Sequence, residues 1–289
     1  MIDMLDSVNN TEHLGELEKA ESVWALQEAG EFLEKEMTKY DTELSYDVTA
    51  REQSFFKTIN YTEYAGCLMI CPLQFELRDK QMFDALYGDP VPAPLDFIPH
   101  FKSKIESDTA NKYKGRNSST STGKRLVVLA GSNVLKTKIC LDKLRAIGEK
   151  DDVLFKPHPI TTHTMVGELK DLFGSTRVAD RDSDLYAMLP AADIVYTSHV
   201  SESALYAVCL GKQIEPIDAY GEVFKGSFYH LNKWLFSEEN PTQVVNKLFN
   251  SYKSGLICPA LDPDWKLKIV QYLEYIHKER DKYANFYIT

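Results

Sequence analysis

The sequence lacks the features that carry a chain into or through a membrane. No apolar run approaches the roughly 20 residues that a transmembrane helix needs. The start of the chain, residues 1–6, is acidic and has no basic segment followed by an apolar core, as a secretory signal has. The five cysteines are an odd number in apolar surroundings, which indicates reduced, buried thiols. We therefore expect a cytoplasmic protein without a membrane span.

Short motifs that identify common enzyme classes are also absent. Without GxGxxG or GxxxxGK[ST], neither a dinucleotide site nor a P-loop is supported. There is no HExxH or GxSxG, and the CxxxC spacing of Cys67 and Cys71 has no second pair of ligands. Asp182-Ser183-Asp184 has the letters of a DxD triplet in the context of a helix cap. We expect no metal site and no required cofactor.

Acidic residues are unevenly spread along the chain. Residues 1–60 carry 14 Asp and Glu against five Lys and Arg. They therefore account for most of the net charge of −10, and the rest of the chain is close to neutral. Residues 109–141 contain no acid. Their basic residues are Lys112, Lys114, Arg116, Lys124, Arg125, Lys136 and Lys138. Such a stretch can attract an anion, and a solvated basic linker is the alternative.

Short apolar runs alternate with segments of helical periodicity in the second half of the chain. The runs are residues 126–130, 153–156, 177–179, 194–197 and 213–217. This alternation predicts βαβ units and one parallel sheet. Because parallel sheets bind ligands outside the carboxyl ends of their strands, the polar residues that follow the runs are expected at one rim. These residues are Lys156, His158, Ser198, Ser201, Glu202 and Asp218.

His158 is the main catalytic candidate at this rim. Prolines on both sides fix its backbone, and Lys156, two residues earlier, points to the same side of an extended chain. The imidazole either caps the loop or contacts a phosphate together with the ammonium of Lys156. Gly131 and Ser132 belong to a further loop that is a candidate to approach a phosphate or a substrate.

Hydroxyl groups gather at the start of a second predicted helix, residues 202–210. Ser198, Ser201 and Ser203 either cap this helix or bind a diphosphate without a metal. Glu202 either suits the first turn of the helix or accepts a hydrogen bond from a sugar hydroxyl. Gly211 stands where a glycine that ends a helix belongs.

A second candidate rim lies in the first half of the chain. Residues 65–73 read as a buried strand, and Glu76 and Asp79 follow it as candidate bases for a hydroxyl acceptor. The Ser- and Thr-rich residues 117–123 have the composition of a linker. They predict an acceptor-side domain at 1–120 and a donor-binding domain at 121–289, with a last helix that crosses back to the first domain.

Residues 125–218 resemble the donor-binding half of GT-B-fold glycosyltransferases. The matching positions are Lys156-Pro157-His158-Pro159, Ser198 to Ser203, and Gly211-Lys212. They are similar to the branch that includes capsule Kdo transferases, polysialyltransferases and CDP-glycerol glycerophosphotransferases, in which the His-Pro histidine and a serine-rich helix start contact the donor's phosphate. The resemblance implies an α/β fold of two Rossmann-like lobes, with a parallel sheet in the C-terminal lobe. Glu202 lies earlier than the glutamate of the family pattern.

The resemblance also implies a reaction. A sugar would pass from a nucleotide-sugar donor to a hydroxyl acceptor without a metal, and the acceptor would be a glycan, a small molecule or a hydroxymethylated base in DNA. The acid-free basic residues 109–141 are the reason to include DNA. The alternatives are a phosphotransferase that uses a CDP-alcohol and a non-catalytic protein that binds a nucleotide sugar.

Overall fold

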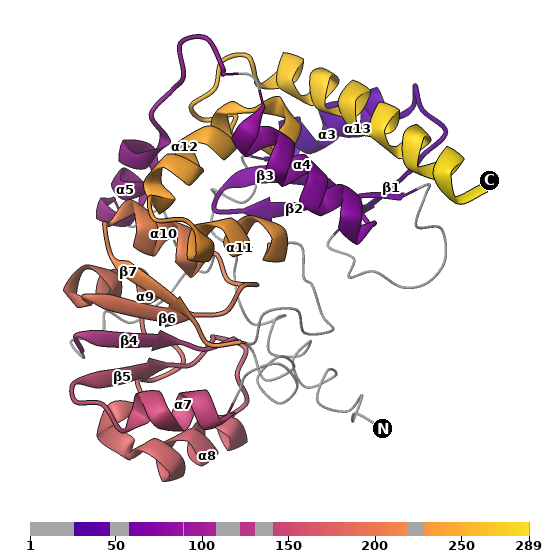
Figure 1. Ribbon diagram of the computed structural model, residues 1–289. Coiled ribbons are helices and arrows are strands. Elements are labelled where there is room, and N and C mark those ends of the chain that lie inside the picture. Colours follow the sequence, from indigo (N-terminus) through magenta and orange to yellow (C-terminus); the bar gives the residue numbers. More distant parts are fainter. Residues whose placement is uncertain are drawn as a thin grey trace. The chain divides into compact units, whose positions relative to one another are not determined.

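Two four-stranded sheets organise the chain, as a computed structural model shows (Figure 1). The structure describes residues 26–46, 58–88, 90–107, 122–130, 141–218 and 228–288. Contacts between residues divide the chain into two units. Of the described residues, unit 1 holds 102–107, 122–130 and 141–218, and unit 2 holds 26–46, 58–88, 90–101 and 228–288.

The sheet of unit 1 is parallel throughout, as the sequence predicts. β4 (Arg125–Val128) lies between β5 (Val153–Lys156) and β6 (Ile194–Thr197), and β7 (Gln213–Pro216) pairs with β6. β5 and β6 have the predicted bounds, and β7 ends one residue early. β4 starts one residue early and ends two residues early, at Val128.

The predicted strand at 177–179 is wrong in extent. The chain forms a 3-10 turn, η1 (Ser175–Arg177), and reaches the sheet only through a single parallel bridge between Val178 and Phe155. It turns away directly afterwards, where the Ser183 N–H donates to the Asp180 carbonyl. With this bridge counted, the sheet runs from the segment at Val178 through β5, β4 and β6 to β7. In chain order these are the third, second, first, fourth and fifth segments. That is the order of doubly wound nucleotide-binding sheets.

Helices cover the sheet of unit 1. α7 (Leu141–Gly148) and α8 (His163–Phe173) place buried side chains against Val127, Phe155 and Tyr196 on one face. α10 (Ser203–Cys209) is buried along its whole length and packs beside β6 and β7. Because crossovers between parallel strands are right-handed, the connections on the two sides of β4 leave on opposite faces. Asp184 precedes α9 (Leu185–Met188) and caps it, because its carboxylate accepts from the Tyr186 N–H.

The sheet of unit 2 corrects the expectation of a Rossmann-like first lobe. Its order is β1 (Glu43–Tyr46), β2 (Thr58–Tyr64), β3 (Cys67–Pro72) and β8 (Leu256–Ile257), and only β1 and β2 are parallel. The physical reason is the turn at Ala65 and Gly66, where φ is +54° and +75°. Positive φ at two successive residues makes the tight hairpin that joins antiparallel strands. These two residues were expected to start the strand.

Unit 2 combines both ends of the described chain. α3 (Gln27–Met37) and α13 (Trp265–Ile288) share one apolar core with Ile59, Ile70 and Ile257 of the sheet. The other helices are α4 (Phe75–Tyr87), α11 (Tyr229–Ser237) and α12 (Pro241–Asn250), while α5 (Phe97–Glu106) runs across the boundary between the units. The expected domain 121–289 is therefore divided, because 228–288 belong with unit 2. The expected linker 117–123 lies mostly outside the described residues. No helix in the described ranges is both long enough and apolar enough to cross a bilayer.

Gly255 is needed where η3 (Tyr252–Ser254) turns into β8. Its φ is +71°, and a Cβ atom at this position would lie 2.0 Å from the Ile70 carbonyl oxygen. The close approach lets the Ile70 N–H donate to the Gly255 carbonyl at 2.9 Å. Only a residue without a side chain allows the short strand β8 to join the sheet here.

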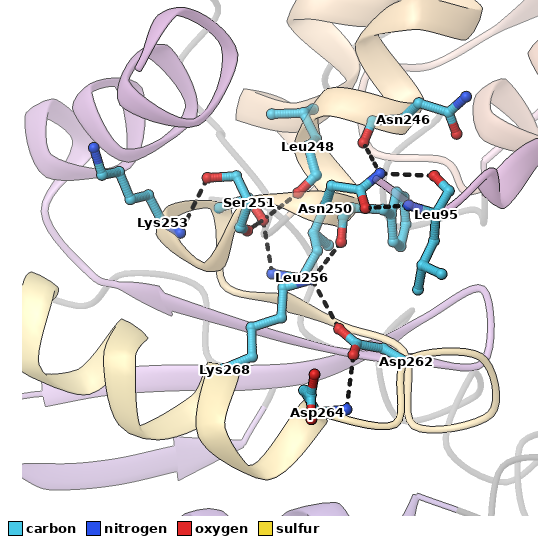
Figure 2. A network of polar contacts seen from close by, with 12 residues as sticks. Leu95, Asn246, Leu248, Asn250, Ser251, Lys253, Leu256, Asp262, Asp264 and Lys268 are labelled. Atoms are coloured by element: carbon cyan, nitrogen blue, oxygen red, sulfur yellow. Dashed lines mark hydrogen bonds and ion pairs between the residues drawn. The ribbon is translucent and has the colours of Figure 1, made fainter. Parts of the chain in front are cut away.

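A buried lysine ties α12 to the start of α13 (Figure 2). The Lys268 ammonium donates to the Phe249 carbonyl and lies 3.3 Å from the Asp262 carboxylate. Burial lowers the pKa of Lys268, and the charge of Asp262 opposes this effect. In the same network the Asn250 amide both donates to and accepts from the Leu95 backbone, at 2.8 and 2.7 Å.

Two substitutions should separate the charge of Lys268 from its apolar stem. Asp262→Asn keeps the shape but leaves the buried ammonium without its carboxylate, so the free energy of unfolding should fall by about 3 kcal/mol. Lys268→Met removes the more buried charge and keeps the volume, and Asp262 keeps its hydrogen bond from the Asp264 N–H, so the loss should be smaller than for Asp262→Asn. Urea unfolding of both variants measures the difference. A larger loss for Lys268→Met than for Asp262→Asn would contradict this account.

Candidate functional site

The strand order of unit 1 reverses between β4 and β6. In doubly wound sheets, ligands bind outside the carboxyl ends of the strands at such a switch point. On one side β4 is followed by Leu129 and Ala130, and the predicted residues Gly131 and Ser132 lie outside the described residues. On the other side Ser198 and His199 follow β6 directly.

A histidine that follows β6 contacts a carboxylate that follows β7. His199 is buried, and its Nδ1 lies 2.6 Å from Oδ1 of Asp218. The His199 N–H and the Ser198 hydroxyl both donate to Oδ2 of the same carboxylate, at 3.0 and 2.6 Å. Burial raises the pKa of Asp218, but the hydrogen bonds from His199 and Ser198 outweigh it and hold the pKa below its ordinary value. The carboxylate is therefore ionised at neutral pH and ties the two strand ends together.

The predicted serines do come together after β6. The Ser203 hydroxyl lies 2.6 Å from the Thr197 hydroxyl and 2.7 Å from the Ser201 hydroxyl. Ser201 also accepts from the Ser203 N–H at 3.3 Å, but the residue at the cap position of α10 is Glu202 and not Ser201. Ser198 and Ser203 are buried, whereas Ser201 and Glu202 are half-buried. The Glu202 side chain makes no capping hydrogen bond.

His158 lies in a tight turn after β5. The ring is half-buried, and its Nδ1 accepts from the Ile160 N–H at 3.2 Å. The Thr161 N–H donates to the His158 carbonyl at 2.9 Å, which closes the turn. Because Nδ1 accepts, a neutral ring carries its proton on Nε2. This is the tautomer in which Nε2 donates to an anion.

Lys156 is placed differently from the expectation that it stands beside His158 at the rim. It is 2 % exposed, and its ammonium donates to the carbonyls of Pro157 and Arg181 at 2.6 and 2.8 Å. These bonds tie the end of β5 to the chain that follows Val178.

A second cation that the sequence did not single out lies beside this turn. The Arg181 guanidinium is half-buried and donates to the Thr161 carbonyl at 3.1 Å. The Thr161 hydroxyl is fully buried and has no hydrogen-bond partner in the described part of the chain. The His158 turn therefore combines an imidazole, a guanidinium and an unpaired hydroxyl. Since β4 separates β5 from β6, this turn and the serine loop start roughly 10 Å apart.

Glu76 and Asp79, the two candidate bases, lie in the first turns of α4. Glu76 is exposed. Asp79 lies 2.9 Å from Nδ1 of His230 on α11 and 3.2 Å from the Lys233 ammonium. Burial raises the pKa of Asp79, but the hydrogen bonds and charges of His230 and Lys233 outweigh it, so the pKa lies below its ordinary value. A carboxylate with a lowered pKa is a weaker proton acceptor.

Neither a metal centre nor a relative helps to interpret these residues. Within the ranges that the structure describes, no group of three or more His, Cys, Asp or Glu could hold a metal ion. The chain matches no protein-family model, and no curated protein matches it significantly. The site has to be interpreted from its own chemistry.

Replacing Asp218 by Asn should lower the free energy of unfolding at pH 7 by about 1–3 kcal/mol, because His199 and Ser198 lose an ionised partner. Since the folded pKa of Asp218 is below its ordinary value, the carboxylate stabilises the fold above about pH 4. This contribution is lost as the pH falls through the folded pKa. The difference between wild type and variant in urea unfolding should therefore shrink between pH 7 and about pH 2.

Asp180→Asn is the matched control. Asp180 lies 3.6 Å from the Lys170 ammonium, and its side chain is 80 % exposed. An exposed ion pair contributes less than about 1 kcal/mol, so this variant should change little at either pH. A difference between wild type and Asp218→Asn that stays constant with pH would refute the stabilising role of the carboxylate.

Proposed function

We propose that the protein is a glycosyltransferase that uses a nucleotide sugar, and that unit 1 is a donor-binding lobe of the GT-B type. The observation that carries this proposal is the doubly wound order of the parallel sheet, with the His158 turn and the serine loop 198–203 at strand ends on the two sides of β4. The resemblance of residues 125–218 to GT-B donor halves points to the same two segments. The acceptor is a hydroxyl group of a glycan, a small molecule or a hydroxymethylated base in DNA.

The chemistry of the His158 turn suits a departing diphosphate. In sugar transfer, the bond between the sugar and the diphosphate breaks, and its electron pair goes to the phosphate oxygen. Preorganised donors that face this developing charge lower the barrier. His158 offers Nε2–H, and Arg181 adds a positive charge to the same turn. The unpaired Thr161 hydroxyl is a further donor next to both residues.

The serine loop has two roles in this proposal. Ser198 and Ser203 are buried and hold the loop through Asp218 and Thr197. Ser201 and Glu202 are half-buried, and they are the side chains of the loop assigned to the phosphate and to a sugar hydroxyl. Lys156 positions the His158 turn through its bonds to backbone carbonyls. Gly131 and Ser132 lie outside the described residues and stay candidates for contact with the phosphate or the substrate after β4.

His158→Ala tests this assignment. A thermal-shift screen of UDP-, GDP- and CMP-sugars and CDP-alcohols first identifies the donor. At 100 times its Kd the donor should stabilise the wild-type protein by about 2.7 kcal/mol. The variant should stay folded because the ring is half-buried. Loss of the charged hydrogen bond in the transition state should slow transfer roughly 30- to 1000-fold, or about 2–4 kcal/mol. The turnover of the best donor measures this change.

His163→Ala is the control, because His163 begins α8 five residues further along the chain and is exposed. It should leave turnover unchanged. Near-wild-type turnover by folded His158→Ala would remove this histidine from the mechanism. Binding of a donor without turnover would indicate a non-catalytic nucleotide-sugar-binding protein. Transfer of a unit that contains phosphate would indicate a phosphotransferase.

A DNA acceptor has its own signature. DNA binding weakens steeply with salt, because phosphate neutralisation releases counterions. Reversing the charges of Lys112, Lys114 and Arg116, which lie outside the described residues, should then weaken binding further. Acceptor binding that does not change between low and physiological salt would exclude DNA.

A further inference from the structure

Unit 2 contains buried polar atoms that have no hydrogen-bond partner in the described part of the chain. They are both amide atoms of Gln74, Nη2 of Arg78, Nε2 of His230 and Nε1 of Trp234. Gln74, Arg78 and His230 are 8 %, 3 % and 1 % exposed. Buried polar atoms are nearly always paired in folded proteins, so several unpaired ones together indicate a missing partner.

Local structure brings two of these side chains to the start of α4. Gln74 is the residue that precedes the helix, and its side chain makes no capping hydrogen bond. Arg78 lies one helical turn later and therefore on the same face. Its Nε donates to the Pro72 carbonyl at 2.5 Å, which directs the guanidinium back toward the beginning of the helix.

His230 reaches the same turn from α11. Its ring centroid lies 4.3 Å from that of Phe75, the first residue of α4. Burial lowers the pKa of His230, the hydrogen bond to Asp79 opposes this, and the nearby charge of Arg78 lowers it further. A neutral ring whose Nδ1–H donates to Asp79 leaves Nε2 as an acceptor. The missing partner of Nε2 is therefore a donor, such as a hydroxyl group.

The charge of this cluster favours an anion. Arg78 and Lys233 are cationic, and the Asp79 carboxylate contacts both His230 and Lys233. Glu76 on the same turn is exposed. The unpaired N–H groups at the start of a helix add further positive potential. An anionic group would satisfy Nη2 of Arg78 and the NH₂ group of Gln74.

We propose that the first turn of α4 and His230 form a site for an acceptor that carries a hydroxyl group beside an anionic group. The carboxylate or phosphate accepts from Arg78 and Gln74, and the hydroxyl donates to Nε2 of His230. Sugar acids and sugar phosphates have this combination. The role as acceptor rests on the proposed transferase function, whereas the binding of the anion does not depend on it.

Calorimetric titration of the full chain tests the site with three matched probes: D-glucuronate, D-glucose 6-phosphate and uncharged D-glucose. At least one of the two anions should bind, and glucose should bind at least 10-fold more weakly. Binding of glucuronate alone or of the phosphate alone identifies the anionic group. If neither anion binds in the millimolar range, or if glucose binds equally well, the proposal is wrong.

Gln74→Met links binding to the unpaired atoms. It removes an amide without partners at similar volume, so it should weaken anion binding at least 10-fold and raise the Tm of the ligand-free protein by about 1–3 °C. Gln81→Met is the control on the same helix. Gln81 is fully buried, but its amide donates to the Ser254 carbonyl at 2.8 Å and accepts from the Tyr272 hydroxyl at 3.1 Å. That variant should lower the Tm and leave the affinity for the anion unchanged.

Two results would overturn the proposal even if an anion binds. An unchanged affinity in Gln74→Met would place the anion elsewhere. A Tm that falls as much as in Gln81→Met would show that ordered water already satisfies the Gln74 amide. Donor binding, tested through His158, is measured separately, so loss of the donor function and loss of this site give different results.

Discussion

The pairing of β4 with a parallel strand on each side is the constraint on which unit 1 depends. A parallel neighbour cannot be reached by a hairpin, so the chain must cross over a face of the sheet each time it returns. With right-handed crossovers, the connection from β4 to β5 and the later return to β6 lie on opposite faces. Because β5 and β6 both run parallel to β4, the segments that follow them emerge at the same edge of the sheet, on the two sides of β4. His158 and the serine loop share this edge because of topology, before any contact between side chains is considered.

The two histidine–aspartate pairs show how the same chemistry serves different purposes. At His199 the carboxylate of Asp218 also receives a backbone N–H and the Ser198 hydroxyl, so the pair locks two strand ends. At His230 the carboxylate of Asp79 orients one ring nitrogen while the other has no partner among the described residues. The first pair is complete in itself. In the second, Nε2 is unpaired within the described residues, and this difference is the basis for proposing that the second pair binds a ligand.

Local sequence pattern predicted four of the five strands expected in unit 1, but it did not predict the sheet of unit 2. The runs 153–156 and 194–197 are strands with the predicted bounds, because each is a buried apolar run that ends at a turn. Gly211 follows the end of a helix as expected, with a φ of +70°. In unit 2, β8 has only two residues and pairs with β3, which lies far away in the sequence. Two residues carry no periodicity, and a pairing over such a distance leaves no trace in a local window. The predicted domain boundary therefore followed composition, and the prediction returned only the last helix to the first domain, whereas all of 228–288 belong with unit 2.

Residue type after a strand can be read from sequence, but the direction of a side chain depends on what surrounds it. Lys156 was expected at the rim by its alternation with His158, yet two backbone carbonyls hold its ammonium. The partnership of Asp79 with His230 spans 151 residues and has no local signal. Gln74 and Gln81 make the same point within one helix. Both are buried, but only Gln81 meets partners, the Ser254 carbonyl and the Tyr272 hydroxyl. Stability alone would favour an apolar residue at position 74, since an unpaired buried amide is costly. A polar residue that the fold does not satisfy is explained when a ligand satisfies it.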